Sequence, residues 1–285
     1  MGFNKISHRQ ALGIFLAVLL WTATANATKE TRVVTLGANL TAKEQRHMMR
    51  TFGAPFQSAG RLTINHRQEE DLLQGVAPQS QIGTRSISSS AVQLESSGYG
   101  IRVATHNITW VTPKMYANAL ATAGVKNARI EAAAPFPVSG TAALAGILTA
   151  YQSATGRNIP YTQERTAAKE LITTGSLGDA IGSKAAAATL ILRVKESVLA
   201  HHATTPGAIR PIVIQEANKL SIRLTTREVT QVTNLMVSVS RLPIDVASLS
   251  AQLKGFEAEA ARVAPPGFWH QLIAWLGRIW RAITS

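Results

Sequence analysis

The spacing of apolar residues changes once along this chain, near Thr162, and this change limits the fold more than any other feature. Before it, short strand-like runs alternate with helix-like segments. After it, apolar residues recur at helical spacing, although Pro211 and Pro243 predict breaks. The helices predicted in this later part are Thr162–Thr174, Ala180–Ala200, Ala208–Leu220, Thr226–Ser240 and Val246–Ala261. We therefore predict an α+β fold, with a mixed β-sheet and helices in the N-terminal half and an all-helical C-terminal half.

Turn residues and helix caps divide the N-terminal half into elements. Thr41 and Glu44 have the spacing of a capping box, and Thr112 precedes a proline at a first helical position. We expect Ser139 to cap a helix as well. The predicted strands are Arg32–Leu36, Arg61–Asn65, Gly83–Glu95, Gly100–His106 and Arg129–Ala133. The predicted helices are Ala42–Phe52, His66–Gln74, Pro113–Ala123 and a segment from Ser139 to about Thr155.

The order of these elements predicts how the sheet is built. The strands Gly83–Glu95 and Gly100–His106 are joined by the short linker Ser96–Tyr99, so we expect them to pair. Val34–Gln74 and Val103–Tyr151 both read strand, helix, strand, helix. This weak repeat predicts one mixed sheet made of two βαβα halves.

Residues 1–27 are typical of a secretory signal peptide. Lys5 and Arg9 precede the unbroken apolar run Ala11–Trp21, and an Ala-Asn-Ala cleavage site directly precedes Thr28. The alternative is an uncleaved anchor, but the run is short for a membrane span. We predict an exported protein with a signal peptide (1–27), an α/β sheet subdomain (28–157), a helical subdomain (158–264) and a C-terminal tail (265–285).

The chain is strongly basic and has no cysteine. Its formal charge is +13, and residues 1–27 contain Lys5, Arg9 and no acid, which leaves +11 for residues 28–285. Such a charge favours anionic partners, namely a lipid surface, a wall polymer or an acidic glycan, or else serves solubility alone. Nucleic acid is not expected, because the chain is predicted to be exported and has no dense basic run. The lack of cysteine excludes thiol catalysis, thiolate metal sites and disulfides.

Four segments of this sequence are distinctive. They are VVTLGANLT (Val33–Thr41), QIGTRSISSSAV (Gln81–Val92), THNITWVTPKMYANALATAGVKNA (Thr105–Ala128) and APFPVSGTAALAGILTAY (Ala134–Tyr151). Through them the chain resembles the YpuA-like family of exported bacterial proteins, also called domain of unknown function 1002, from about Val33 to Gly255. The resemblance implies a secreted or envelope protein, mainly of Gram-positive bacteria, and no activity, cofactor or functional residue.

The charge of the helical half differs from what the resemblance implies. Its members are often acidic in the helical half, whereas this chain carries basic residues there. They are Arg193, Lys195, Arg210, Lys219, Arg223 and Arg227. We therefore expect a partner that recognises charge to differ for this chain.

Two small groups of residues are candidates for chemistry in the N-terminal half. Ser139, Gly140 and Thr141 precede a helix, where free N–H groups favour an anion or expose a serine nucleophile, although no GxSxG or P-loop motif is present. His106, Asn107 and Trp110 lie at the end of a predicted strand and either line a sugar or peptide groove or form a turn with a core tryptophan. The histidines show no metal-ligand spacing, so we predict neither a metal site nor a cofactor.

The C-terminal tail has the composition of an amphipathic interfacial helix. Three of the five tryptophans of the chain lie in it, together with two arginines. The residues predicted to contact a membrane surface are Phe268, Trp269, Leu272, Trp275, Leu276, Arg278, Ile279, Trp280 and Arg281. Alternatively, the tail docks on the helical subdomain, on a second copy or on a protein partner.

These observations favour a non-enzymatic function. We expect an exported, envelope-associated protein that binds anionic membrane or wall-polymer surfaces through its charge and its tail. The alternative is a secreted hydrolase or ligand-binding protein with a cleft near His106 and Ser139.

Overall fold

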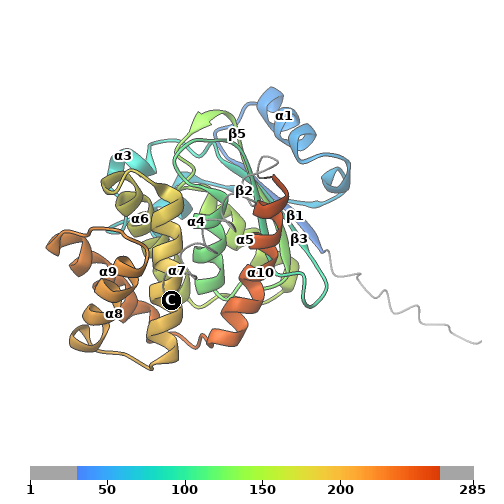
Figure 1. Cartoon of the computed structure of the whole chain (residues 1–285). Helices are drawn as coiled ribbons and strands as arrows, with labels where there is room; N and C mark the ends of the chain where they lie inside the picture. Colours follow the sequence, from blue (N-terminus) through green and yellow to red (C-terminus); the bar gives the residue numbers. More distant parts are fainter. Residues whose placement is uncertain (1–30, 264–285) are drawn as a thin grey trace, which may run out of the picture.

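The structure is a computed structural model that describes residues 31–263. The predicted signal peptide (1–27) and C-terminal tail (265–285) lie outside the described residues. Within the described range, the chain forms a five-stranded mixed sheet in its N-terminal half and helices in its C-terminal half, which confirms the predicted α+β class (Figure 1).

The sheet has the strand order β2-β1-β3-β5-β4. Its strands are β1 (Arg32–Gly37), β2 (Gly60–Ile64), β3 (Ser89–Leu94), β4 (Ile101–Ile108) and β5 (Ala128–Val138). β1 and β2 pair in parallel, as do β4 and β5, while β3 is antiparallel to both β1 and β5. The parallel pair of β1 and β2 therefore lies toward one edge of the sheet, the pair of β4 and β5 lies toward the other edge, and β3 lies between the two pairs.

The predicted pairing of the third and fourth strands is wrong, because β5 lies between β3 and β4. The burial of the strands explains this order. Residues 128–134 of β5 include the fully buried Ile130 and Ala132, so the strand suits the interior of the sheet, whereas β4 alternates and suits an edge. The short linker between β3 and β4 would favour their pairing, but the burial of β5 favours its position between them.

Helices cover both faces of the sheet and then extend away from it. They are α1 (Ala42–Phe52), α2 (His66–Leu73), α3 (Gln79–Ile82), α4 (Pro113–Thr122), α5 (Ala143–Thr155), α6 (Tyr161–Ala180), α7 (Lys184–Ala200), α8 (Pro206–Lys219), α9 (Thr226–Val239) and α10 (Val246–Val263), with a 3-10 turn η1 at Ala54–Phe56. The predicted capping box is present, since Thr41 Oγ1 accepts from Glu44 N–H and Glu44 accepts from Thr41 N–H.

Pro211 does not break its helix, contrary to the prediction. It lies in the second turn of α8, which continues to Lys219. Because proline lacks an N–H, the helix loses only the hydrogen bond to the carbonyl of Gly207, close to its own N-terminus. The helix is therefore interrupted by one missing bond rather than ended.

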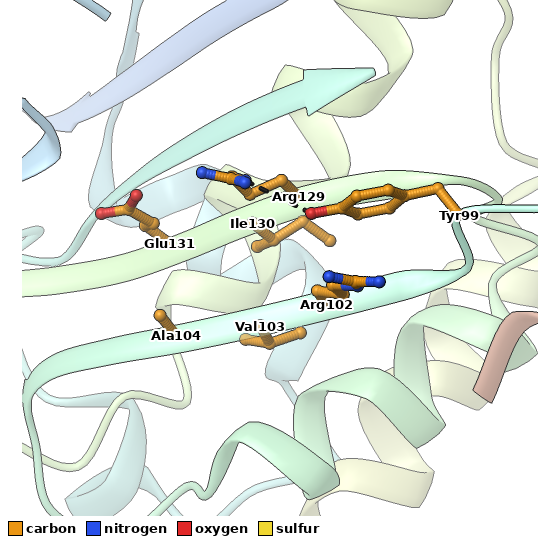
Figure 2. Close-up of a pocket in the computed structure, with 7 residues that line it drawn as sticks. All are labelled: Tyr99, Arg102, Val103, Ala104, Arg129, Ile130 and Glu131. Atoms are coloured by element: carbon orange, nitrogen blue, oxygen red, sulfur yellow. Dashed lines mark hydrogen bonds between the residues drawn. The ribbon is translucent and has the colours of Figure 1, made fainter. Parts of the chain in front are cut away.

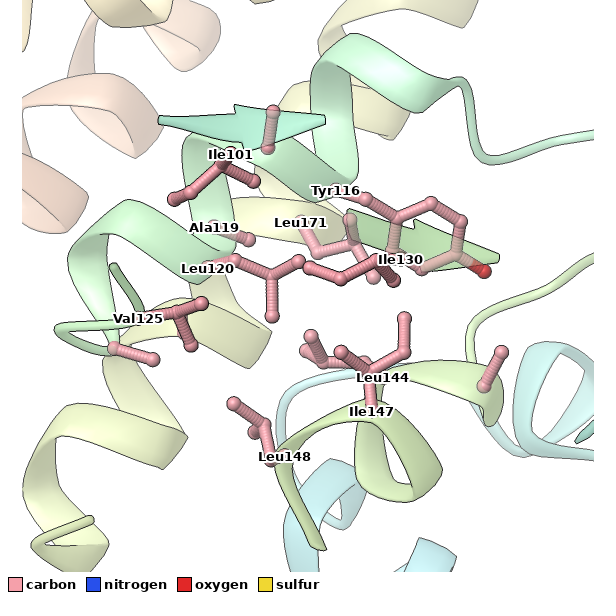
Figure 3. Packing of buried hydrophobic residues seen from close by; sticks show 14 of the residues in the cluster. Ile101, Tyr116, Ala119, Leu120, Val125, Ile130, Leu144, Ile147, Leu148 and Leu171 are labelled. Carbon is pink, nitrogen blue, oxygen red and sulfur yellow. The ribbon is translucent and has the colours of Figure 1, made fainter. Parts of the chain in front are cut away.

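Alternate residues of the strands pack against different helices. Val33 faces a core that includes residues of α4 and α5, whereas Val34 faces residues of α1 and η1. Figure 3 shows Tyr116 and Leu120 of α4 packed near Ile130 of β5 and the side chains of α5. This core also includes residues of α6 and α7, while a second apolar cluster lies among α7, α8 and α9. α1 covers only part of its face of the sheet, which leaves polar side chains of the same face accessible.

Candidate anion-binding face

A row of polar side chains crosses the sheet on the face that carries α1. The strand register brings together Arg32 of β1, Gln93 of β3, Arg129 of β5 and Arg102 of β4. Arg32 Nε donates to Gln93 Oε1 at 3.1 Å. Since side chains alternate along strands, Val34 lies on this face too, two residues beyond Arg32 and beneath α1. The row therefore lies beside the covered part of the face.

Part of this row lines a hollow of about 230 Å³ over β4 and β5. Figure 2 shows Tyr99, Arg102, Arg129 and Glu131 around it. Arg129 Nε donates to Tyr99 Oη at 3.3 Å, and the guanidinium carbon of Arg102 lies 4.3 Å from the centroid of the Tyr99 ring. The tyrosine thus contacts two guanidinium groups from neighbouring strands, an arrangement that favours an anionic group above them.

Acidic side chains partly neutralise this hollow. Glu131 Oε2 lies 3.5 Å from His106 Nε2, and Glu95 Oε1 lies 4.0 Å from Arg129 Nε. Burial raises the pKa of Glu131 above its ordinary value, and the nearby His106 and Arg129 act in the opposite direction. The hollow over β4 and β5 therefore holds both signs of charge and its arginines already have protein partners.

A second groove, between α1 and β2, is more uniformly basic. It has a volume of about 370 Å³ and its rim includes Arg46 and Arg50 of α1 and Arg61 of β2. Its floor includes Leu36 and Met49, which are both buried. We call this feature the α1–β2 groove; the remaining side chains that line it are Ala42, Gln45 and Gln57.

The arginines of the α1–β2 groove have few protein partners. Arg61 Nη2 donates to the carbonyl of Gln57 at 3.0 Å. Within residues 31–263, the side chains of Arg46 and Arg50 have no hydrogen bond and no ion pair, and no described side chain lining this groove is acidic. Three guanidinium groups that line one groove without acidic neighbours make it a candidate site for an anion.

The structure separates the three residues that the sequence grouped around His106. The imidazole of His106 lies on the α1 face of the sheet, beside Glu131. Asn107 has a φ of 57° and its Nδ2 donates to the carbonyl of Ala134 at 2.9 Å, so it shapes the backbone. Trp110 instead contacts the α6–α7 junction, where its Nε1 donates to Asp179 Oδ2 at 2.8 Å.

The indole of Trp110 packs closely against the helical half. A Cβ atom on Gly175 of α6 would lie 2.0 Å from the indole, so only glycine fits there. Lys184 Nζ lies 4.1 Å from the ring centroid on Trp110 and forms an ion pair with Asp179 at 2.6 Å. Trp110 therefore connects the sheet half to the junction between α6 and α7.

We expect Trp110→Phe to lower the free energy of unfolding by about 2–3 kcal/mol. Phenylalanine loses the N–H that donates to Asp179, and its shorter ring does not replace the outer indole atoms Cζ2, Cζ3 and Cη2 that lie nearest Gly175. Urea unfolding followed by circular dichroism measures this change. A loss below about 0.5 kcal/mol would contradict the view that these contacts join the sheet half to the α6–α7 junction.

Ser139, Gly140 and Thr141 lie between β5 and α5. The prediction that Ser139 caps the helix is wrong, because α5 begins after Ala142 and has no side-chain cap. Ser139 Oγ lies 3.3 Å from Thr141 Oγ1, and Thr141 is fully buried. The carbonyl of Gly140 accepts a hydrogen bond from the buried hydroxyl of Tyr116. The three residues thus form a tightly packed connection in which two polar side chains contact each other.

Other predicted features either lie outside the described residues or have local contacts. The tail residues from Phe268 to Arg281 lie outside the described residues. Among residues 31–263, no group of histidine and acidic side chains is arranged to hold a metal ion, and His201 Nδ1 contacts the carbonyl of Ser197 at 2.8 Å. No helix in the same range is long and apolar enough to cross a membrane.

Sequence reasoning missed the arginines that form both basic features. A usable signal was present for α1, because Lys43, Arg46 and Arg50 recur at helical spacing and share one side. For Arg102 and Arg129 no such signal existed. They lie opposite each other because β4 and β5 are neighbours in this register, and no local pattern indicates the register.

Comparisons with known proteins place the chain in a family. Residues 36–256 match the family model described as a protein of unknown function (DUF1002). The chain is 34% identical over 284 residues to the uncharacterized protein YpuA of Bacillus subtilis (strain 168), and the match covers 96% of both chains. No solved structure matches the chain. By the extent of both matches, the chain belongs to the DUF1002 family of YpuA-like proteins.

Proposed function

We propose that this protein is an exported, non-enzymatic component of the cell envelope that binds anionic membrane or wall-polymer surfaces. The observation that carries the proposal is the basic face built by α1 and the sheet. Its arginines are Arg32, Arg46, Arg50, Arg61, Arg102 and Arg129. Such a face attracts anions from a distance and holds them through guanidinium groups.

The sequence supports the exported location and a second contact with the surface. Residues 1–27 have the pattern of a signal peptide, and the tail combines three tryptophans with Arg278 and Arg281. The tryptophans would lie at the boundary between lipid and water while the arginines contact anionic headgroups. The basic face and the tail would then bind the same envelope surface.

The arrangement around His106 and Ser139 favours binding over hydrolysis. A hydrolase needs a nucleophile next to its base, with a third group that orients the base. His106 Nε2 lies 3.5 Å from Glu131 Oε2 on the α1 face, whereas Ser139 Oγ lies 3.3 Å from the hydroxyl of the buried Thr141. A role as a binding protein needs no such alignment.

Removal of the tail tests its part in the proposal. We expect residues 28–285 to sediment with anionic vesicles, and a variant that lacks Phe268–Ser285 to bind at least about thirtyfold more weakly. Two arginines near an anionic surface contribute about 2 kcal/mol, which corresponds to this factor before any tryptophan is counted. Binding should also weaken as salt is added.

Neutral vesicles and an insoluble wall fraction are the controls for this measurement. Strong binding of the intact protein to neutral vesicles would contradict the electrostatic part of the proposal. Failure of both forms to bind anionic vesicles and wall material would contradict the proposal as a whole.

A further inference from the structure

We propose that the α1–β2 groove binds successive phosphodiester groups of a polyanionic chain, such as a polymer of glycerol phosphate. This inference rests on the proposed function and narrows it to one chemical class and one site. The groove supplies three guanidinium groups at its rim and an apolar floor.

The three arginines come from two elements that face the same space. Arg46 and Arg50 are four residues apart on α1, so their Cβ atoms are about 5–6 Å apart on one side of the helix. Arg61 lies on β2 and is paired with Val34, whose side chain packs beneath α1. The groove thus presents cations from both of its sides.

Structural stability does not account for this cluster. Like charges held close together repel each other, and within residues 31–263 Arg46 and Arg50 have no acidic partner that would compensate. Both side chains are exposed, so they contribute little to the core. A ligand that carries negative charge would remove the repulsion.

The chemistry of the groove fits a phosphodiester chain better than other anions. A phosphodiester has two free oxygens and one charge, which match the planar fork of a guanidinium group. The floor of Leu36 and Met49 can contact the carbon spacer between two phosphates. A single inorganic phosphate has no such spacer, and a flat bilayer presents headgroups to a surface rather than to a groove.

The test compares two charge-matched variants of residues 28–285, the mature chain expected after export. One variant carries Arg46→Gln, Arg50→Gln and Arg61→Gln in the groove. The control carries Arg223→Gln, Arg227→Gln and Arg241→Gln, which are exposed residues of the helical half. Figure 1 shows α1 far from α8 and α9, so the control removes equal charge at a distant place.

Calorimetric titration with a synthetic glycerol phosphate oligomer gives the affinity. We expect the groove variant to bind about tenfold or more weakly, because it loses three guanidinium forks, and the control to change only slightly. A polyglutamate of equal length and charge should bind the intact protein less well than the oligomer. Circular dichroism should show unchanged folding; otherwise the single variants Arg46→Gln and Arg50→Gln give the same comparison.

Several results would overturn the inference. These are equal losses in the groove variant and the control, equal affinity for polyglutamate, or binding of anionic vesicles without binding of the oligomer. In each of these cases the proposed function would stand, because the intact protein still binds an anionic partner. Binding to neither the oligomer, the vesicles nor wall material would overturn both.

Discussion

Replacing Lys195 by methionine is expected to lower the free energy of unfolding by about 3–5 kcal/mol. Lys195 of α7 and Glu170 of α6 form an ion pair at 2.7 Å in which both side chains are fully buried. The variant leaves the Glu170 carboxylate in the core without its cation. Denaturant unfolding followed by circular dichroism measures the loss.

The contacts of Lys195 explain why the expected loss is large. Its ammonium group donates to Glu170 Oε1, to Thr122 Oγ1 at 2.8 Å and to the carbonyl of Asn118 at 3.0 Å. Thr122 Oγ1 in turn donates to Glu170 Oε2 at 2.6 Å. All three ammonium protons and both carboxylate oxygens are therefore used, and the network joins α4, α6 and α7.

A double variant separates the ion pair from its burial cost. We expect Lys195→Met combined with Glu170→Met to recover most of the stability, because two apolar side chains replace two buried charges. The hydroxyl of Thr122 can then donate to the carbonyl of Asn118, four residues earlier in α4. Lys43→Met on the surface is the control and should change stability by less than about 0.5 kcal/mol. Equal losses in the single and double variants would contradict this account.

The position of Lys195 also shows where sequence reasoning stops. The sequence groups it with basic residues such as Arg223 and Arg227 as part of a charged helical half, but Lys195 is fully buried whereas those arginines are exposed. Its partners are 25 to 77 residues away, so no local pattern identifies them. The burial of Lys195 therefore depends on these long-range contacts, which the composition of the chain does not reveal.

Local signals predicted most elements of the fold correctly. Thr41 and Glu44 begin α1 as expected, and α1 ends at Phe52, before a glycine with a φ of 79°. Periodicity found the helices of the second half because their apolar faces are continuous. Strand order was not predictable in this way, because hydrogen bonds between β3 and β5 depend on burial of the whole sheet.

The candidate site, like the strand order, depends on long-range contacts that local signals do not predict. The overall basic charge suggested an anionic partner, yet the site that the structure favours is formed by Arg46, Arg50 and Arg61, which were not singled out. Arg61 joins the other two only because β2 pairs with β1 beside α1. The placing of charge on one face therefore required the tertiary structure.

A buried carboxyl group provides the second large effect, which depends on pH. Glu69 of α2 is fully buried, and burial raises its pKa from the ordinary 4.5 to about 7. Ser86 Oγ lies 2.6 Å from Glu69 Oε1 and 2.7 Å from the carbonyl of Ile64. Ser86 has a single hydroxyl proton, so it cannot donate to both. A protonated Glu69 resolves this conflict, because it donates to Ser86, which then donates to Ile64.

We therefore expect the protein to lose stability as pH rises from 4.5 through about 7. The folded protein keeps the proton of Glu69 in this range while the unfolded chain releases it, so the stabilisation is complete below pH 4.5 and is lost above pH 7. The difference between the two pKa values corresponds to about 3 kcal/mol. Urea unfolding at a series of pH values from 4 to about 8.5 measures the decline.

The variant Glu69→Gln removes this titration from the protein. His66, whose Nδ1 lies 3.6 Å from Glu69 Oε2 and acts to lower the pKa of Glu69, is present in both proteins. Glutamine keeps the shape and a donor for Ser86 but has no charge, so the variant should match the wild type near pH 4.5 and be more stable by up to about 3 kcal/mol near pH 8. Glu70→Gln is the matched control on the same helix. Glu70 is partly exposed and lies 3.3 Å from His66, so its replacement should leave the decline nearly unchanged. If Glu69→Gln declined with pH as steeply as the wild type, the proton of Glu69 would not be held by the folded structure.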